Sequence, residues 1–368
     1  MKGYYLKKVL SSLFVLFAII SLNFFLPRMI FSDPAQPYYV GVPEDAYALR
    51  EQIREEYGFN KPLIVQYFDY LGRVVTLDLG ESHYYKESVW NVMFSRIPWS
   101  MVLTVSSMLI SVLLGILFGA IAGKHRDKTA DKVLMWLSGI TTAIPSFWLA
   151  LVAVMLFGFT FKLFPYRGAM TAGYTLSMNS SLFAIVFMVG VAIVIGIKII
   201  IKKSIILFIG VPMSLIIALL VAVSLGDILD IAYHATLPVA ISVFSGVISY
   251  GLLVRNSMIA VTNEDYILTA RAKGLPPHVV LYKHTFRNAL LPLITNVGMS
   301  MAGLMGGSVL MEKIFSWPGM GQLLLDACNT GDYQLSQAIL LLFAVITVVC
   351  NFMTDLVYHK FDPRVREV

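Results

Sequence analysis

Long apolar runs, each of the length that crosses a lipid bilayer, constrain the fold of this chain more than any other feature. A helix needs about 20 apolar residues to cross about 30 Å of hydrocarbon, because each residue advances it by about 1.5 Å. Eight stretches reach that length, at about 9–31, 99–123, 134–161, 181–201, 204–225, 235–260, 289–311 and 336–358. The backbone of such a segment must satisfy its own hydrogen bonds in lipid, so each stretch is predicted to be a helix.

The composition excludes a soluble protein and a disordered one. Hydrophobic residues make up 58% of the 368 residues and charged residues only 14%, whereas ordinary soluble domains carry roughly a quarter charged residues. So few charges cannot cover a globular surface of this size, and disorder requires low hydrophobicity with high charge. We therefore expect an all-α integral membrane protein in contact with lipid.

The basic residues predict how the spans are oriented. Lys and Arg collect on the cytoplasmic side of membrane spans, and the short outer loops of an eight-span arrangement hold only Lys162, Arg167 and Lys313. We therefore predict a multi-pass protein with both termini cytoplasmic. The net charge of +6 follows from this bias and does not point to nucleic acid. The first run is expected to be retained, because residues 25–28 lack the small residues of a signal-peptide cleavage site.

No enzyme motif occurs in the sequence. It contains neither the His-Glu-x-x-His pattern of zinc proteases nor the Gly-x-Ser-x-Gly elbow of hydrolases. The only Gly-Lys pair, Gly123-Lys124, lacks the rest of a phosphate-binding loop, since Phe118 and His125 stand where Gly and Ser or Thr are needed. We expect no catalytic residue, metal or cofactor in this chain, so any ATP-driven step belongs to another polypeptide.

Two outer segments are long enough, or patterned enough, to fold. The first lies within 32–98 and contains a charged, helix-like stretch at 44–57 and an apolar-aromatic stretch at 63–79. Such a length favours a folded cap over a flexible linker. The second outer segment, 312–335, contains the sequence FSWPGMG at 315–321.

The cytoplasmic segment 261–288 has the sharpest local pattern in the chain. Thr262 is predicted to cap a helix over 265–273, which ends at Gly274. Two prolines then suit the first turn of a second helix, at about 277–289. Small residues gather at the tip of this helix–turn–helix and basic residues flank it. The pattern favours either a surface on which a partner docks closely or a basic loop that rests on anionic lipid headgroups.

Several stretches resemble one family of membrane proteins. EDYILTARAKGL at 264–275 and HTFRNALLP at 284–292 are similar to the cytoplasmic EAA loop of ABC importer permeases, and more narrowly to those of the dipeptide/oligopeptide/nickel type. Further stretches resemble the same permeases in the same order along the chain, namely YGFNKPLIVQY at 57–67, DLGES at 78–82, IPSFWL at 144–149, FSWPGMG at 315–321 and DPRVR at 362–366. Their joint occurrence makes the resemblance specific.

The resemblance implies the type I ABC importer permease fold, which has six core transmembrane helices. It divides the chain into an N-terminal transmembrane helix (1–31), an extracytoplasmic loop region (32–98) and a permease transmembrane domain (99–368). Residues 175–228 are additional to that pattern, and their two apolar runs predict an inserted transmembrane hairpin whose lysines lie inside. Its lack of polar residues favours a peripheral, lipid-facing hairpin; the alternative is a docking site for another membrane subunit.

The resemblance also implies partners. The chain is expected to be one permease subunit of a bacterial cytoplasmic membrane, in a heterodimer with a second permease subunit. Two ABC ATPase subunits, which bind ATP and Mg, dock on the coupling loop 261–288, and an extracytoplasmic substrate-binding lipoprotein delivers the cargo. The residues carried over to the ATPase contact are Tyr266, Thr269, Ala270, Arg271, Ala272, Gly274 and Leu275. The position of the first Glu in the general motif holds Leu268 here.

Two further patterns concern the spans. Gly115, Gly119 and Gly123 recur every four residues, which predicts the close approach of a neighbouring helix. Polar or adaptable residues in the span 289–311 are candidates for the translocation path, with ordinary core packing as the alternative for the methionines. The candidates for the path are Thr295, Asn296, Met299 and Met305.

The cargo implied by the resemblance is a di- or oligopeptide, with nickel or another small solute as the alternative within the same family. A secondary transporter driven by an ion gradient is a rival class. It calls for buried charges near the membrane midplane, and the candidate spans hold few of these. A membrane scaffold that transports nothing is the other rival.

Overall fold

The computed structural model describes residues 2–30, 35, 39, 46–171, 214, 225–301 and 309–361. Within these ranges the chain is helical, and its β-type pairing is limited to an isolated bridge between Glu81 and Ser88. The elements in chain order are α1 (Lys2–Ile30), α2 (Tyr47–Glu56), α3 (Leu63–Thr76), α4 (Val89–Lys124), α5 (Thr129–Ala143), α6 (Ser146–Ala153), the π-helix η2 (Val154–Thr160), α9 (Leu225–Thr262), α10 (Asp265–Ala272), α11 (Pro277–Val279), the π-helix η3 (Val280–Phe286), α12 (Arg287–Ala289), α13 (Leu291–Met301), α14 (Val309–Ile314), α15 (Met320–Thr330) and α16 (Tyr333–Phe361).

Four helices in the described ranges are long and apolar enough to cross a membrane. These candidate spans are Lys7–Phe25, Val89–Lys124, Gly226–Thr262 and Tyr333–Thr354. They overlap four of the predicted runs, at 9–31, 99–123, 235–260 and 336–358. The predicted run 289–311 is covered by α12, α13 and the start of α14, apart from 302–308. The two runs of the predicted hairpin, 181–201 and 204–225, lie almost wholly outside the described residues.

The predicted run 134–161 is broken in the structure. It consists of α5 followed by α6 and η2, and the two halves are bent by 93°. Pro145 explains the break, because a proline disfavours helical geometry in the residue before it. Ile144 is accordingly extended, with φ −109° and ψ 116°. The run is therefore a bent pair of helices rather than one straight rod.

Helices α4 and α9 form the centre of the described fold, and glycines bring them together. A Cβ atom on Gly115 would lie 2.7 Å from the Tyr250 Cβ, and one on Gly119 would lie 2.5 Å from the Gly251 carbonyl oxygen. Neither distance is possible for a real side chain. The four-residue glycine spacing of α4 thus marks a close helix contact, as predicted, and α9 is the partner.

Helices α1, α3 and α16 pack together at the outer end. The Asn23 amide in α1 donates to the Gln337 carbonyl at 2.7 Å, and the Gln337 amide donates to the Asn23 carbonyl at 3.2 Å. Phe24 is fully buried, and its ring lies 5.2 Å from that of Tyr67 in α3. The predicted charged and apolar-aromatic stretches of the outer segment are α2 and α3, respectively.

The sequence FSWPGMG joins α14 to α15 and anchors both to α4. Trp317 is fully buried, and its indole donates to the Trp99 carbonyl at 2.8 Å. Glu312 is 1% exposed and accepts hydrogen bonds from the Ser100 hydroxyl and from the backbone of Gly321, each at 2.7 Å. A Cβ atom on Gly319 would lie 2.5 Å from that carboxyl group, so this position of the motif requires glycine.

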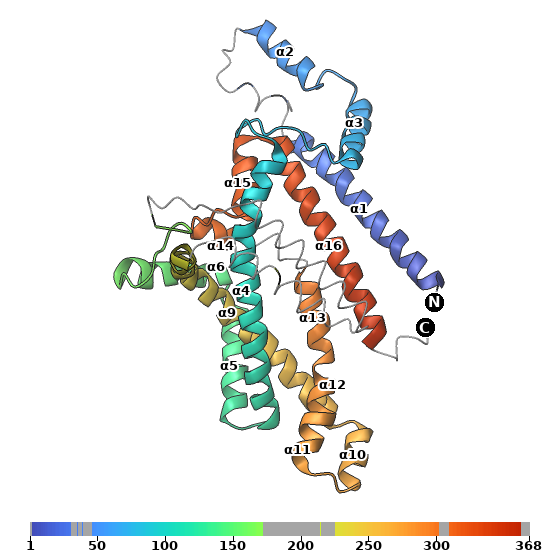
Figure 1. The fold of residues 1–368 in the computed structure, drawn as a ribbon, viewed down its shortest axis with the longest axis vertical. Helices are drawn as coiled ribbons and strands as arrows, with labels where there is room; N and C mark the ends of the chain where they lie inside the picture. The colour runs from blue at the N-terminus through green and yellow to red at the C-terminus, as the bar shows by residue number, and fades with distance from the viewer. Residues whose placement is uncertain are drawn as a thin grey trace.

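The elements that carry candidate sites lie at the two ends of the long axis (Figure 1). Helices α2 and α3 occupy one end, and α10 and α11 occupy the opposite end. The beginning of α1 and the end of α16 lie close together, away from α2 and α3. Helix α4 runs from near α15 down to α5, and α9 runs beside it from the middle of the molecule to α10 (Figure 1).

Candidate functional site

The predicted coupling loop is a helical elbow that continues directly from α9. Its first helix, α10, begins after Glu264, which is the extended N-cap residue. The prediction that Thr262 caps this helix is wrong. Thr262 is the last residue of α9, and its hydroxyl donates to the Met258 carbonyl at 2.7 Å. Helix α9 therefore continues two residues past the end of the predicted run 235–260.

A left-handed glycine turns the chain between the two arms of the elbow. Gly274 has φ +72°, and its amide donates to the Arg271 carbonyl at 2.9 Å. Pro277 then starts α11, as predicted for a proline in a first turn. The second arm is α11, η3 and α12 in succession. A Cβ atom on Gly274 would meet nothing within 4 Å, so the backbone conformation alone requires glycine here.

The two arms hold each other through a small core. Ile267, Ala270 and Val280 are at most 5% exposed and pack together, with Val261 at the edge. The Asn288 amide donates to the Tyr266 hydroxyl at 3.0 Å and adds a polar link between the arms. Ala270 therefore faces the interior of the elbow, whereas the small-residue pattern placed it with Ala272 and Gly274 at the tip.

The remaining predicted contact residues are exposed. Tyr266, Thr269, Arg271, Ala272, Gly274 and Leu275 all lie on the surface of the elbow. Leu268 is 55% exposed and Tyr282 is 62% exposed, so apolar groups accompany the basic side chains. An exposed apolar surface rimmed by charge is typical of an interaction site. The structure thus brings six of the seven predicted residues onto one accessible feature.

The elbow is joined firmly to two long helices. Val254 and Met258 of α9 pack with Ala289 and Leu293 of the second arm and α13, and all four are buried. A force on the elbow therefore reaches α9 and α13 together, because the residues that join the elbow to the two helices belong to one packed cluster.

An ion pair extends this connection to α5. The Arg255 guanidinium donates to both carboxylate oxygens of Asp131, at 2.7 and 2.9 Å. Asp131 is 2% exposed, and bidentate pairs of this kind fix orientation as well as distance. This pair was not predicted from the sequence, because a single acid in a basic loop resembles a solvated residue until its partner is known.

Three of the four predicted path residues lie on α13, where they differ in exposure. Asn296 and Met299 lie on the exposed side of α13, with Met299 58% exposed. Thr295 is half-buried, and its hydroxyl donates to the Leu291 carbonyl at 3.5 Å. Met305 lies outside the described residues. The exposed side of α13 therefore carries an amide that a lipid environment would disfavour.

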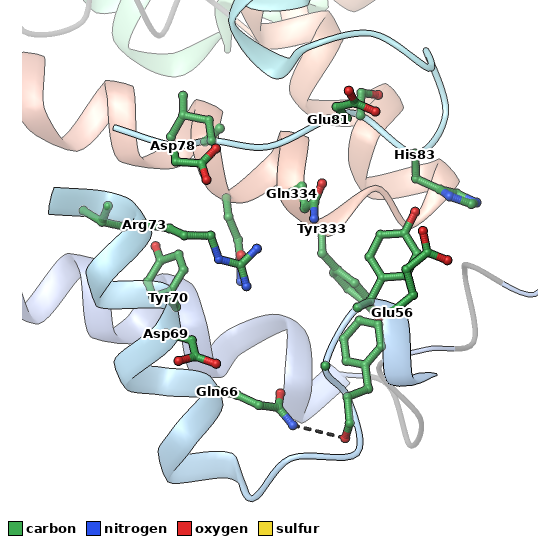
Figure 2. Close-up of a pocket in the computed structure, with 18 of the residues that line it drawn as sticks. Glu56, Gln66, Asp69, Tyr70, Arg73, Asp78, Glu81, His83, Tyr333 and Gln334 are labelled. Carbon is green, nitrogen blue, oxygen red and sulfur yellow. Dashed lines mark hydrogen bonds between the residues drawn. The ribbon is translucent and has the colours of Figure 1, made fainter. Parts of the chain in front are cut away.

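The outer end contains a cavity of about 570 Å³ that the sequence analysis did not predict. Figure 2 shows its walls, which come from α3, the end of α2, the segment after α3 and the start of α16. The segment after α3 is fixed by Asp332, whose carboxylate accepts from the Ser82 hydroxyl at 2.5 Å and from the Tyr84 amide at 3.1 Å. Burial lowers the pKa of His83 in the cavity wall, and nearby Lys86 adds to the effect.

Comparison with known proteins identifies the family. The model of the family described as "Binding-protein-dependent transport system inner membrane component" matches residues 197–367, and the model of its N-terminal region matches residues 1–104. The chain belongs to this family, whose members are the membrane permeases of ABC importers. The family is one of transport permeases, not of enzymes. The chain is accordingly a multi-pass inner-membrane component of a transport system, and it works with a substrate-binding protein and an ATPase.

Relatives of the chain are similar over nearly their whole length. The oligopeptide transport system permease protein AppB of Bacillus subtilis is 30% identical over 366 residues, which cover 99% of each chain. The di/tripeptide transport system permease protein DppB of Pseudomonas aeruginosa is 31% identical over 350 residues, which cover 95% of this chain and 94% of the relative. A putative peptide transport system permease protein of Brucella abortus is 30% identical over 363 residues, or 98% of each chain.

Proposed function

We propose that this chain is a permease subunit of an ATP-driven importer of di- or oligopeptides. The observation that carries the proposal is the exposed, rigidly based elbow within a family of binding-protein-dependent permeases. The cargo is supported by full-length similarity to relatives that are named for oligopeptides and di/tripeptides. The chain supplies part of the path, and separate ATPase subunits bind and hydrolyse ATP with Mg.

The elbow converts closure of the ATPases into movement of the membrane helices. The exposed residues of the elbow contact the ATPase surface, namely Tyr266, Thr269, Arg271, Ala272, Gly274 and Leu275. Ala270 acts differently, because it keeps the two arms packed. The buried cluster at the base of the elbow then passes the displacement to α9 and α13. The movement opens the path alternately to the outside and to the cytoplasm.

A second permease subunit completes the path, and we propose that the pair is a heterodimer. The exposed side of α13, with Asn296 and Met299, faces the second subunit or the water-filled path between the two. Polar residues in membrane helices face protein or water rather than lipid, which supports this placement. Thr295 lies beside that face, and Met305 is retained as a candidate on its sequence position alone.

The elbow and both termini lie on the cytoplasmic side in this proposal. The elbow is at the end of the molecule opposite α2 and α3 (Figure 1), and it carries Arg271, Lys273 and Lys283. Basic residues favour the cytoplasmic side of a membrane. Helices α2 and α3 are then extracytoplasmic, where the substrate-binding lipoprotein docks.

The coupling role predicts a selective defect for Arg271→Glu. This exposed residue forms no part of the elbow's core, so the subunit should still insert into the membrane. Charge reversal at the docking surface should reduce ATPase retention and ATP-driven uptake by about 10-fold or more, because contact between like charges costs several kcal/mol. Copurification of the ATPase subunits and uptake of a labelled peptide by the complete importer are the measurements.

The matched control is Arg126→Glu, which makes the same charge change in the exposed turn between α4 and α5. It should leave uptake near the wild-type level. Full ATPase retention and normal uptake in Arg271→Glu would refute the coupling role, and uptake driven by an ion gradient without ATPase subunits would favour a secondary transporter.

A further inference from the structure

The outer cavity is built by segments that are far apart in the sequence. Its walls include Arg28 at the end of α1, residues 55–74 around α2 and α3, residues 78–86, and residues 333–341 of α16. Its volume of about 570 Å³ falls in the range of about 300–1,000 Å³ that is typical of sites for small ligands. Helices α2 and α3, which contribute to its wall, lie at the end of the molecule opposite the elbow (Figure 1).

Some of the charges in the wall neutralise each other. Lys61 and Asp69 form an ion pair at 2.7 Å, and hydrogen bonding from Lys61 holds the pKa of Asp69 below its ordinary value. Arg28 donates to the Gln66 side-chain oxygen, at 3.3 and 3.4 Å, and lies over the Phe24 ring. The Lys61–Asp69 pair therefore offers little charge to a ligand, and Arg28 keeps its positive charge while its guanidinium is held by these contacts.

Charges of both signs are left over for a ligand. The side chains left without an ion pair to another residue in the described part of the chain are two cations and four carboxylates, namely Arg73, Lys86, Glu55, Glu56, Asp78 and Glu81. Figure 2 shows the Arg73 guanidinium extending from α3 toward the middle of the cavity, with the carboxyl groups of Glu56 and Glu81 at the wall. A ligand that carries one charge of each sign fits this distribution better than a strongly charged anion or cation does.

The rest of the wall suits a ligand with amide groups and apolar side chains. The rings of Tyr57 and Phe59 stack at 6.3 Å between centroids and present an apolar surface. Gln334, at the start of α16, adds an amide that both donates and accepts. The cavity therefore combines opposite charges with aromatic and amide groups.

We propose that this cavity binds a short peptide in its zwitterionic form, as an extracytoplasmic subsite of the permease itself. Arg73 binds the terminal carboxylate, and Glu56 or Glu81 binds the terminal ammonium group. The proposal rests on the proposed function, since it assumes that the transported solute is a peptide. The concave shape and inward-facing charges favour a small ligand over a surface of the docked binding protein.

The test measures peptide binding to the permease without its binding protein. The importer, with both permease subunits and the ATPases, is placed in lipid nanodiscs, and trialanine is titrated by isothermal calorimetry. Wild type should bind trialanine saturably, and Arg73→Gln should weaken binding about 10–100-fold, as expected for the loss of a charge-assisted hydrogen bond. Lys313→Gln removes a positive charge from the outer end outside the cavity and should leave binding unchanged.

Capped peptides assign the two ends of the ligand. Trialanine amide lacks the terminal carboxylate, so it should bind wild type weakly and lose nothing further in Arg73→Gln. N-acetyl-trialanine lacks the ammonium group and should also bind wild type weakly. Because it keeps the carboxylate, Arg73→Gln should weaken its binding further. Equal binding of free and capped peptides would overturn the proposal.

Two other results would also overturn the proposal. One is the absence of saturable trialanine binding to wild type. The other is a loss of binding-protein affinity in Arg73→Gln without any peptide binding, which would make the cavity a docking surface.

ATP-driven uptake of trialanine, measured separately with the binding protein present, decides the proposed function. Uptake without binding at the cavity removes only the subsite, and failure of uptake removes the peptide-importer function.

Discussion

At the scale of single residues, Glu312 is the most informative charged group. Its carboxylate accepts hydrogen bonds from Ser100, Gly321 and Gln322 while it is almost fully buried. Replacing Glu312 by Leu leaves these donors unpaired at about 1–3 kcal/mol each, so we expect a marked fall in the unfolding temperature of the subunit in detergent micelles. Glu312→Gln retains an acceptor, so its unfolding temperature should fall much less. Equal losses in the two variants would show that the hydrogen bonds are unimportant.

The same residue predicts a pH dependence. Burial raises the pKa of Glu312 above its ordinary value of 4.5, although the three hydrogen bonds oppose the change. A raised pKa in the folded state means that the contribution to stability is full below pH 4.5 and is lost as the pH rises through the folded value. The unfolding temperature of wild type should therefore fall relative to that of Glu312→Gln over this window. Parallel pH profiles would contradict this account.

The motif FSWPGMG stands out in the sequence, but the sequence alone does not show why its glycines are required. Trp317 and Pro318 suggest an anchor and a turn from their residue types alone. The need for glycine at 319 and 321 depends on Glu312 and Val309, which a Cβ atom would meet within 2.5 and 2.8 Å. That need follows from tertiary contacts, which a single sequence does not contain.

At the scale of helices, the contact between α4 and α9 is the main determinant of stability. Gly119→Leu would push a side chain into the Gly251 backbone, and overpacking of this kind costs about 1–3 kcal/mol or more. We expect a lower yield of folded subunit and a lower unfolding temperature. Gly139→Leu makes the same change on α5, where a Cβ atom meets nothing within 4 Å, and should be tolerated. Similar behaviour of the two variants would contradict the close contact.

Periodicity and composition predicted most of the helices, and the misses have local causes. The glycine spacing indicated a close contact but not its partner, because any apolar helix could supply one. The apolar run 134–161 concealed a 93° bend, since Pro145 interrupts the backbone without changing the hydropathy. Thr262 matched a capping pattern, yet its hydroxyl bonds back into α9. Ala270, predicted to contact the ATPase, packs in the elbow's core, and its contact with the ATPase stays a prediction.

At the scale of the whole molecule, the sequence predicted the elbow and the outer helices but not the cavity between α3 and α16. The cavity joins residues more than 250 positions apart, so no local pattern reveals it. The predicted hairpin 175–228 lies almost wholly outside the described residues, as does the motif at 362–366. The role proposed for the hairpin therefore rests on the residues that flank it.

Those flanking residues predict that the additional segment is dispensable. The Thr171 amide and hydroxyl donate to Asp230 at 2.8 and 2.6 Å, so the chain leaves and re-enters the fold at one place. Replacing 175–222 with a flexible Gly-Ser linker should preserve insertion and ATPase copurification, because such a linker spans a short gap easily. Loss of the assembled complex would show instead that this segment is structural.

The central claim is that the elbow lies in the cytoplasm and is moved by an ATPase partner. Site-specific crosslinking tests it most directly, with Ala272→Cys and Val75→Cys each introduced into a chain without Cys328 and Cys350. We predict that Ala272→Cys crosslinks to the ATPase subunit, in a yield that changes with ATP, and resists a membrane-impermeant maleimide in intact cells. Val75→Cys, on the exposed side of α3, should react with that maleimide from outside. Labelling of Ala272→Cys from outside the cell, with no crosslink to the ATPase, would contradict the account.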